Sequence, residues 1–329
     1  ASENAPREAI LFARDLFRQE RYRAAEDVLL RALRRTPGHV ELLVVLGQIH
    51  IATQDWGRAE QVENTLRRLN SDFAESQAEE LQFQIFGRRE GRERAIAYLE
   101  ELIAADDGSN VATVALIRAR LADGRSNEAL LLAEELVSDL PNNIQAKLVL
   151  GNTHIALSNF QEAETVIRST MERSDDPAVA LQLVRVLSAQ ARVDEAKDAL
   201  EGALTKTPED RNLLWVKASF LEQENRIDDA IQIYEALYTQ DTGSLVIANN
   251  LASLLATYRD DDESLRRAFT VGRRLRGTDI APFQDTYGWI LYRRGQVDEA
   301  LEYLEPAAEV LQSDPIVQFH LAKAYEAVG

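Results

Sequence analysis

The sequence contains no cysteine, and it has only 15 glycines and 8 prolines in 329 residues. The absence of cysteine excludes disulfide bonds, thiol nucleophiles and thiolate metal ligands. It does not fix the compartment, because cysteine-free proteins fold in either redox environment. So few glycines and prolines argue against an all-β protein with its many turns. No apolar run approaches the roughly 18 residues of a membrane-spanning helix, and no signal peptide opens the sequence.

Positive charge is also in deficit, with 37 Lys and Arg against 55 Asp and Glu and a formal net charge of −18. Such a surface repels nucleic acid and anionic lipid. We therefore expect no nucleic-acid partner and no membrane insertion by this segment. The common residues are Ala, Leu, Glu and Arg, which are strong helix formers. With 45 % hydrophobic residues, the composition predicts a helical protein with a sizeable core.

Motifs that carry catalysis or metal binding are missing as well. The sequence has no G–x–x–x–x–G–K–[ST], G–x–G–x–x–G, G–x–S–x–G or H–E–x–x–H. Phosphate-loop, serine-hydrolase and zinc-protease functions are therefore not indicated, because the motif that each of them requires is absent. The acidic stretch 260–263 could attract a hard cation, but it lacks the alternating ligands and the glycine of a calcium-binding loop. A solvated turn is the better interpretation. We expect no enzyme activity, no cofactor and no metal.

What the sequence does contain is one short helical unit, repeated. An alanine recurs at spacings of 34, 36, 34, 34, 33, 34, 38 and 32 residues, within stretches such as VDEAL and NEALL. A period near 34 predicts stacked pairs of antiparallel helices. The recurring alanines are Ala25, Ala59, Ala95, Ala129, Ala163, Ala196, Ala230, Ala268 and Ala300.

A second set of small residues lies in the first helix of most pairs. These residues should let the second helix approach until it meets the recurring alanine. They are Ala13, Gly47, Gly151, Ala218, Ala252, Gly288 and Ala322. The third repeat departs from this pattern, because Phe83 stands where other repeats have a small residue and the glycine of this repeat is displaced. The eighth repeat has about four extra residues around 257–267, which predicts a longer loop. Glycines or polar residues occupy the turn within a pair: Gly124, Gly295, Gln54, Ser158 and Asn225.

The pattern resembles the tetratricopeptide repeat family across nearly all of the chain. The second repeat places Leu43, Leu46, Gly47 and His50 on the family's large–x2–L–G–x2–Y motif, and Ala59 follows. The resemblance implies an all-α, right-handed superhelical solenoid of antiparallel helix pairs, as a single domain over 1–329. The expected pairs span 6–39, 40–73, 74–109, 110–143, 144–176, 177–210, 211–244, 245–280 and 281–314, followed by a closing helix at 315–329.

The same resemblance gives a role to two of the four histidines and suggests a compartment. His50 and His154 fill the slot that the family gives to tyrosine, so we expect them to be packing residues. Stretches such as NNLASLLA and DTYGWILYRRGQVDEAL are similar to bacterial exported or lipid-anchored repeat proteins of exopolysaccharide and protein-sorting systems. This favours the bacterial envelope over the cytoplasm.

Family geometry also predicts which residues line the inner groove of such a stack. The ninth position of the repeat, one residue beyond the small residue of the first helix, points inward in this family. We call these residues the ninth-position row: Arg14, Gln48, Gln84, Arg118, Asn152, Arg185, Ser219, Ser253, Trp289 and Lys323. The row holds four cations and no acid, which suits an acidic or hydrogen-bonding partner. Trp215, from a second inward row, and Tyr292 complete the candidate binding residues.

Three hypotheses for function follow. The first is a non-enzymatic scaffold that binds an extended peptide or a partner domain in its concave groove. The second is a carbohydrate-binding factor in bacterial polysaccharide export, motivated by Trp289 and Tyr292. The third is an enzyme, or the helper arm of an enzyme whose catalytic domain lies outside these residues. For Trp215 and for Trp289, packing between neighbouring repeats is the plain alternative to ligand binding.

Overall fold

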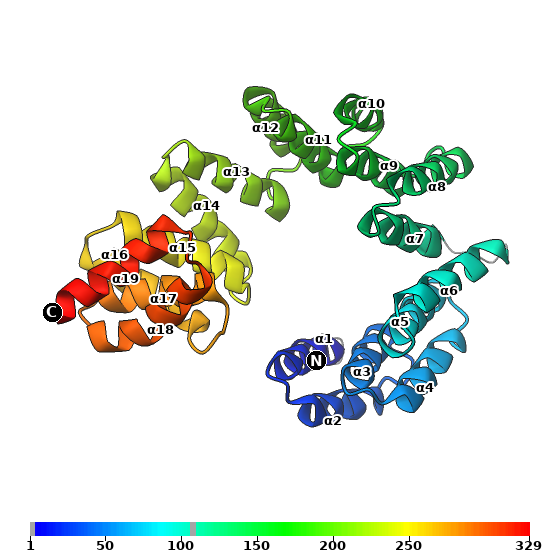
Figure 1. Cartoon of the computed structure of the whole chain (residues 1–329), viewed down its shortest axis with the longest axis horizontal. Helices are drawn as coiled ribbons and strands as arrows, with labels where there is room; N and C mark the ends of the chain where they lie inside the picture. The colour runs from blue at the N-terminus through cyan, green and yellow to red at the C-terminus, as the bar shows by residue number, and fades with distance from the viewer. Residues whose placement is uncertain (1–3, 106–109) are drawn as a thin grey trace. The chain divides into compact units, whose positions relative to one another are not determined.

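The computed structural model describes residues 4–105 and 110–329, and it builds them almost entirely from helices (Figure 1). Nineteen α-helices and one 3-10 helix account for the regular structure, and no strand occurs among the described residues. The predicted all-α repeat fold is therefore confirmed. Residues 106–109, at the end of the third expected pair, lie outside the described residues.

The helices succeed one another in pairs that are joined by short turns. Their bounds are α1 Asn4–Arg18, α2 Tyr22–Leu33, α3 Val40–Ala52, α4 Trp56–Arg67, α5 Asp72–Arg89, α6 Arg92–Ala104, α7 Asn110–Ala122, α8 Ser126–Asp139, α9 Ile144–Ala156, α10 Phe160–Met171, α11 Pro177–Ala189, α12 Val193–Lys206, α13 Arg211–Gln223, α14 Ile227–Gln240, α15 Leu245–Tyr258, α16 Asp262–Gly272, η1 Arg273–Leu275, α17 Ala281–Arg293, α18 Val297–Val310 and α19 Pro315–Val328.

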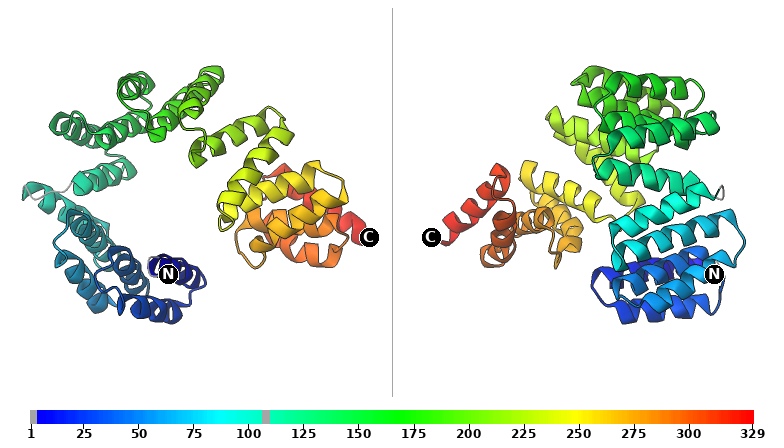
Figure 2. Two further views of the ribbon diagram at one scale, coloured as in Figure 1. Left: turned by 180° about the vertical axis from the view of Figure 1, so that it is seen from behind. Right: turned by 45° about the vertical axis from the view of Figure 1, so that its right-hand side comes forward.

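The chain divides into two compact units, unit 1 from Ala1 to Thr170 and unit 2 from Met171 to Gly329. In unit 1, the two views of Figure 2 show the helices following one another in chain order. Each helix from α1 to α9 packs on the next, and the first helices α1, α3, α5, α7 and α9 also contact in sequence. In unit 2, each helix from α11 to α19 likewise packs on the next, and the first helices contact in the pairs α11 with α13, α15 with α17 and α17 with α19. The single solenoid over 1–329 stays a prediction.

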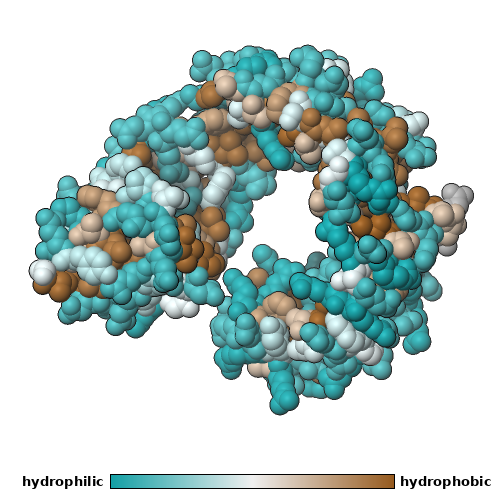
Figure 3. Space-filling model, in the orientation of Figure 1, coloured by the Kyte–Doolittle hydropathy of each residue, from teal (hydrophilic) through white to brown (hydrophobic). Residues whose placement is uncertain are grey.

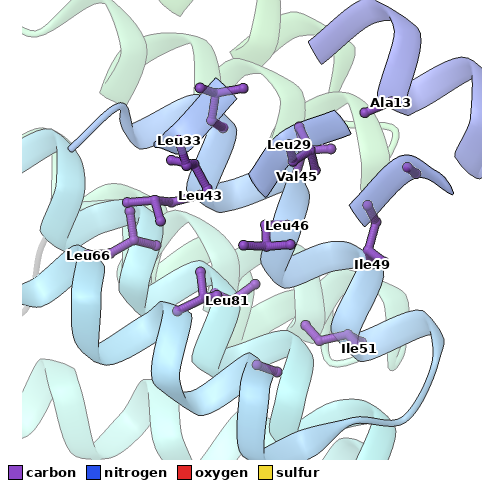
Figure 4. Packing of buried hydrophobic residues seen from close by; sticks show 14 of the residues in the cluster. Ala13, Leu29, Leu33, Leu43, Val45, Leu46, Ile49, Ile51, Leu66 and Leu81 are labelled. Carbon is purple, nitrogen blue, oxygen red and sulfur yellow. The ribbon is translucent and has the colours of Figure 1, made fainter. Parts of the chain in front are cut away.

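The core of unit 1 is made of aliphatic side chains from successive helices. Figure 4 shows Leu46 of α3, Leu66 of α4 and Leu81 of α5 converging, with Leu29 and Leu33 of α2 beside them. All five are at most 9 % exposed. Because each helix buries apolar residues against both the preceding and the following helix, no pair has a complete core of its own. Outside the core, Figure 3 shows hydrophilic residues over most of the visible face, with hydrophobic patches between them.

The recurring alanines lie at the most tightly packed places in the molecule. All nine are buried, with exposures of 0 or 1 %. A side chain larger than a methyl group there would push the helix axes of the pair apart. The prediction that these alanines are helix-contact residues is confirmed. His50 and His154, expected to be packing residues, are likewise buried, at 4 % and 7 % exposure.

The small residues of the first helices lie very close to their neighbours. Some of these neighbours belong to the same helix pair, and others belong to the next pair. A Cβ built on Gly288 would lie 2.7 Å from Leu304 Cγ and 3.1 Å from the carbonyl oxygen of Ala300. At Gly47 the nearest atoms belong to Leu81, 2.6 Å from such a Cβ. Leu81 lies on α5, so the space at Gly47 is filled by the next pair, a contact that the sequence analysis did not predict.

Two further small positions differ from expectation. In the third repeat a Cβ on Gly87, one turn along α5 from Phe83, would lie 3.7 Å from the Cβ of Ala95, which is an ordinary contact distance. Phe83, at the expected position, is half-buried instead. Ala322, on α19, is exposed, whereas the other six small residues of the first helices are buried.

The turns within pairs have the backbone conformation that their residues suggest. Gly124 and Gly295 have φ values of 72° and 78°, and Gln54, Ser158 and Asn225 have values of 58°, 62° and 57°. In this left-handed region glycine is favoured, and a non-glycine residue carries strain. The turn positions read from the sequence are therefore confirmed.

The acidic stretch of the eighth repeat is a capped turn. Asp261 accepts a hydrogen bond from the backbone N of Ser264 at 2.8 Å and so caps α16; this backbone bond lowers the pKa of Asp261. Asp260 Oδ1 lies 2.7 Å from Nη2 of Arg293 on α17. Across the residues that the structure describes, no group of three or more His, Cys, Asp or Glu side chains is placed to hold a metal ion.

None of the described helices combines the length and the apolar character that crossing a membrane requires.

Candidate functional site

Two members of the ninth-position row come together in a hollow of unit 1. The hollow has a volume of about 780 Å³, and Gln48 of α3 and Gln84 of α5 both line it. They occupy the same position in successive repeats, on first helices that contact each other. The remaining lining residues are Phe17, Ile51, Ala52, Gln54, Trp56, Phe83, Gly87, Arg88, Arg92 and Ala95. We call this the unit 1 hollow.

Aromatic rings form the apolar walls of the unit 1 hollow. Phe17, at the end of α1, packs edge-on against Tyr22 with ring centroids 5.4 Å apart. Trp56 opens α4, and Phe83 lies on α5 one position before Gln84. All three rings are half-buried, so each is anchored in the core on one side and presents apolar surface on the other. Rigid aromatic side chains of this kind are common anchors in protein interfaces.

The polar part of the hollow consists of amides and guanidinium groups. Gln84 Nε2 donates to Glu80 Oε1 at 2.9 Å, which leaves the amide oxygen of Gln84 as an acceptor. Arg92 is already paired, with Nε 2.8 Å from Asp123 Oδ1, and it also donates to the carbonyl oxygen of Ala119. Arg88 is exposed. The described lining therefore offers hydrogen-bond donors and acceptors together with positive charge.

The other ninth-position residues of unit 1 do not join this hollow. Arg14, Arg118 and Asn152 are exposed and lie outside its lining. In unit 2, Arg185 is exposed, and Ser219 and Ser253 are half-buried. These side chains remain candidates from family geometry alone.

Trp215 is held by packing within unit 2. Its ring meets that of Tyr234 edge-on, with centroids 5.6 Å apart. Tyr234 donates to Glu222 at 2.7 Å and accepts from Asn250 at 3.1 Å; burial, and then the bond to Glu222, raise the pKa of its hydroxyl. Ser219 Oγ donates to the Trp215 carbonyl at 3.2 Å. Because Tyr234 is fully buried, Trp215 extends the core of this unit, as the packing alternative expected.

A second hollow, of about 700 Å³, lies in unit 2 and includes Trp289, Tyr292 and Lys323. Trp289 is only 7 % exposed. The ring of Tyr292 stacks on it at 4.9 Å and 15°, and the ring of His320 stacks on it at 4.1 Å and 12°. With two parallel rings already against it, the indole is a member of the core and offers little open ring face to a ligand.

The sequence analysis missed the polar pair that completes this cluster. Nδ1 of His320, on α19, lies 3.0 Å from both carboxylate oxygens of Asp285 on α17. Both side chains are buried, at 3 % and 7 % exposure. In the sequence, Asp285 lies in the same second inward row as Trp215, a row that is apolar in many repeats, but its histidine partner lies 35 residues away, in the next repeat.

Lys323 lies at the edge of the same hollow and is ion-paired. Its Nζ is 2.6 Å from Glu326 Oε2, one turn further along α19. The hydrogen bond to this carboxylate raises the pKa of Lys323. One of the four cations that the row placed in the groove is thus neutralised within its own helix.

Comparisons with known proteins agree with the repeat pattern. A family model described as tetratricopeptide repeat matches residues 10–72 and 181–244. A tetratricopeptide-repeat-containing protein of Pseudomonas aeruginosa is 27 % identical over 194 residues. That alignment covers 58 % of this chain and 32 % of the relative, so the chain spans about a third of the relative's length.

Solved structures with a similar fold include a human and a yeast protein. The human IFIT1 dimer, in a complex with PPP-AAAA, is 17 % identical, with 88 % of this chain and 69 % of that chain covered and a TM-score of 0.49. Yeast Tom70 is 12 % identical, with 99 % and 89 % covered and a TM-score of 0.46.

Proposed function

Because the chain is a tetratricopeptide repeat protein, we propose that it is a non-enzymatic scaffold that binds an extended segment of a partner protein along the ninth-position side of its first helices. Repeat proteins of this kind generally serve protein interaction.

One observation carries this proposal: Gln48 and Gln84 line the same hollow of about 780 Å³. An extended peptide offers a carbonyl acceptor and an amide donor at every residue. A glutamine amide offers the complementary donor and acceptor in one side chain. Two such amides on neighbouring first helices can therefore engage the backbone of a segment that passes across both.

The physical character of the hollow suits a segment better than a small metabolite. Its walls are preformed by helices, so the cost of binding falls mainly on ordering the incoming peptide. Among the described residues it contains no metal-binding cluster, and its lining residues carry amides and guanidinium groups but no carboxylate. Such a set can hold a ligand but lacks an acid–base pair.

A carbohydrate-binding function gains no support from Trp289. A sugar-binding platform requires an exposed aromatic face, whereas Trp289 is 7 % exposed and stacked against Tyr292 and His320. We therefore do not propose it.

Selection from a library of random 12-residue peptides displayed on phage tests the proposal. The wild-type protein should enrich peptides, and the enriched peptides should bind in solution by fluorescence anisotropy. The double variant Gln48→Ala/Gln84→Ala should lose at least about tenfold in affinity, since each glutamine can lose hydrogen bonds to the peptide backbone. Its helix content and unfolding midpoint should match those of the wild type.

A matched control is Gln61→Ala/Gln161→Ala. These two glutamines are exposed on the second helices α4 and α10 of unit 1, outside the ninth-position row and outside the hollow. The proposal fails if no peptide is enriched, or if enriched peptides bind equally well to the wild type and to the Gln48→Ala/Gln84→Ala variant.

A further inference from the structure

We propose that the unit 1 hollow selects a segment in which a large apolar side chain lies beside a carboxylate. This inference rests on the proposed function and adds to it the chemistry of the residues that are bound.

The apolar half of the inference comes from three rings. Phe17, Trp56 and Phe83 belong to three different helices and are half-buried; Phe17 and Trp56 pack against one hydrophobic cluster of unit 1, and Phe83 packs against another. Their free surfaces meet in the hollow, together with the exposed methyl group of Ala52. A large aliphatic or aromatic side chain placed there would remove apolar surface of the protein and of the ligand from water at once.

One residue of the lining contributes no side chain to the hollow. Gly87 lies on α5 between Gln84 and Arg88 and lines the hollow. Its missing side chain is not forced by crowding, because a Cβ there would be 3.7 Å from its nearest neighbour, at ordinary contact distance. Glycine in the interior of a helix is unfavourable. In the proposed site, the absence of a side chain at Gly87 leaves space for a side chain of the ligand.

The acidic half of the inference comes from charge complementarity. Of the 329 residues, 55 are Asp or Glu, yet none is among the described residues that line this hollow. Two arginines are. Arg92 is satisfied by Asp123 at 2.8 Å, whereas Arg88 makes no ion pair within the described part of the chain.

A guanidinium group recognises a carboxylate with two parallel hydrogen bonds. Since Arg88 lies one helical turn from Gln84 on α5, one bound segment can reach both. A polyanion such as single-stranded RNA offers negative charge too, but this chain, with a net charge of −18, repels it. The acidic residue of a protein segment is therefore the favoured occupant.

Substitution of Ala52 separates charge from shape. Ala52 is exposed at the last position of α3, and it lines the hollow without holding the core together. Ala52→Glu and Ala52→Lys add side chains of similar length to the same place with opposite charge. Arg88→Glu reverses the charge of the arginine itself, and Arg31→Glu makes the same change on an exposed part of α2 outside the hollow.

The test uses the random peptide library and the peptides that it enriches. Those peptides should share a large apolar residue with Asp or Glu within about two positions. Ala52→Glu and Arg88→Glu should each weaken their binding by about tenfold or more, the loss expected for a hydrogen bond to a charged group. Ala52→Lys and Arg31→Glu should change it less than about threefold, since they remove no favourable charge contact.

The outcomes distinguish the two proposals. If the peptides carry no acidic residue, or if Ala52→Glu and Ala52→Lys weaken binding equally, the selectivity for a carboxylate is wrong while the scaffold proposal stands. If a random single-stranded RNA binds with the same dependence on Arg88, the assignment of a protein segment is overturned. If the library enriches nothing, both proposals fail.

Discussion

Leu304 leaves no room for a side chain on Gly288: a Cβ built on the glycine would lie 2.7 Å from Leu304 Cγ. The two residues lie on α17 and α18, the two helices of the ninth pair. This contact, together with the buried alanine of the same pair, fixes how closely the two helices approach.

Replacing Gly288 with alanine should therefore destabilise unit 2. We expect a loss of about 1–3 kcal/mol in the free energy of unfolding, because a methyl group would be forced into a packed core. The matched control is Gly202→Ala on α12, where a Cβ would meet nothing within 4 Å. That change should stabilise by about 0.5–1 kcal/mol, through helix propensity and a less flexible unfolded chain. Urea unfolding measures both, and similar effects of the two variants would contradict the packing described.

Below neutral pH, His50 should make unit 1 less stable. Burial lowers the pKa of His50 below its usual 6.5, against the opposing influence of Glu26 and Asp55. The unfolded chain therefore takes up a proton more readily than the folded one. This contribution to stability is complete above about pH 6.5 and decreases as the pH falls through that value.

The variant His50→Gln should lose less stability than the wild type when the pH is lowered from about 7.5 to about 5.5, because its side chain does not titrate in this range. The comparison is made by urea unfolding at both pH values. An identical loss in the wild type and the variant would show that His50 is not protected from protonation by burial.

Arg293 should hold the turn between α15 and α16 in place; this turn has only residues 259–261, so the longer loop expected in the eighth repeat is absent. From α17 its guanidinium group donates to the carbonyl oxygens of Ala256 and Arg259, and it pairs with Asp260. Arg293→Lys keeps the charge but cannot reproduce this fork of donors. Amide hydrogen exchange at residues 256–262 should become faster. The neighbouring change Arg294→Lys, whose guanidinium group lies over the ring of Phe269, should leave exchange in that stretch as it is.

Trp289 should behave as a core tryptophan. The chain has three tryptophans, and Trp56 and Trp215 are only half-buried. In variants that keep one tryptophan and replace the other two with phenylalanine, acrylamide should quench Trp289 least. Acidic oligosaccharides should leave its emission unchanged, because both His320 and Tyr292 already stack on the indole. Strong quenching by either agent would mean that the stack opens in solution.

The repeat architecture was largely readable from the sequence because its determinants are local and periodic. Ala300 marks a helix contact by its spacing from the other recurring alanines, and Gln54 marks a turn by its place between two apolar patterns. Both predictions are confirmed, since close helix packing admits only a small residue and the turn requires a left-handed backbone.

Contacts between neighbouring repeats were not readable in the same way. The partner of Gly47 is Leu81, in the next pair, and the covering of Trp289 comes from His320 on α19. These contacts depend on how one pair is rotated onto the next and on which rotamers fill the space, which a 34-residue period does not encode. The sequence placed Gln48 and Gln84 in one row, but it could not show that they share a hollow with Phe17 and Trp56.

The absence of cysteine permits a direct test of where a partner segment lies. Ala52→Cys, in the unit 1 hollow, and Arg31→Cys, on α2 outside it, each give a single thiol in a chain that otherwise has none. Each variant is labelled with a trifluoromethyl group and titrated with a library-selected peptide, and the fluorine resonance is recorded. The account predicts that the resonance at position 52 shifts and saturates while that at position 31 stays unchanged. A silent label at position 52 in the presence of a bound peptide would contradict it.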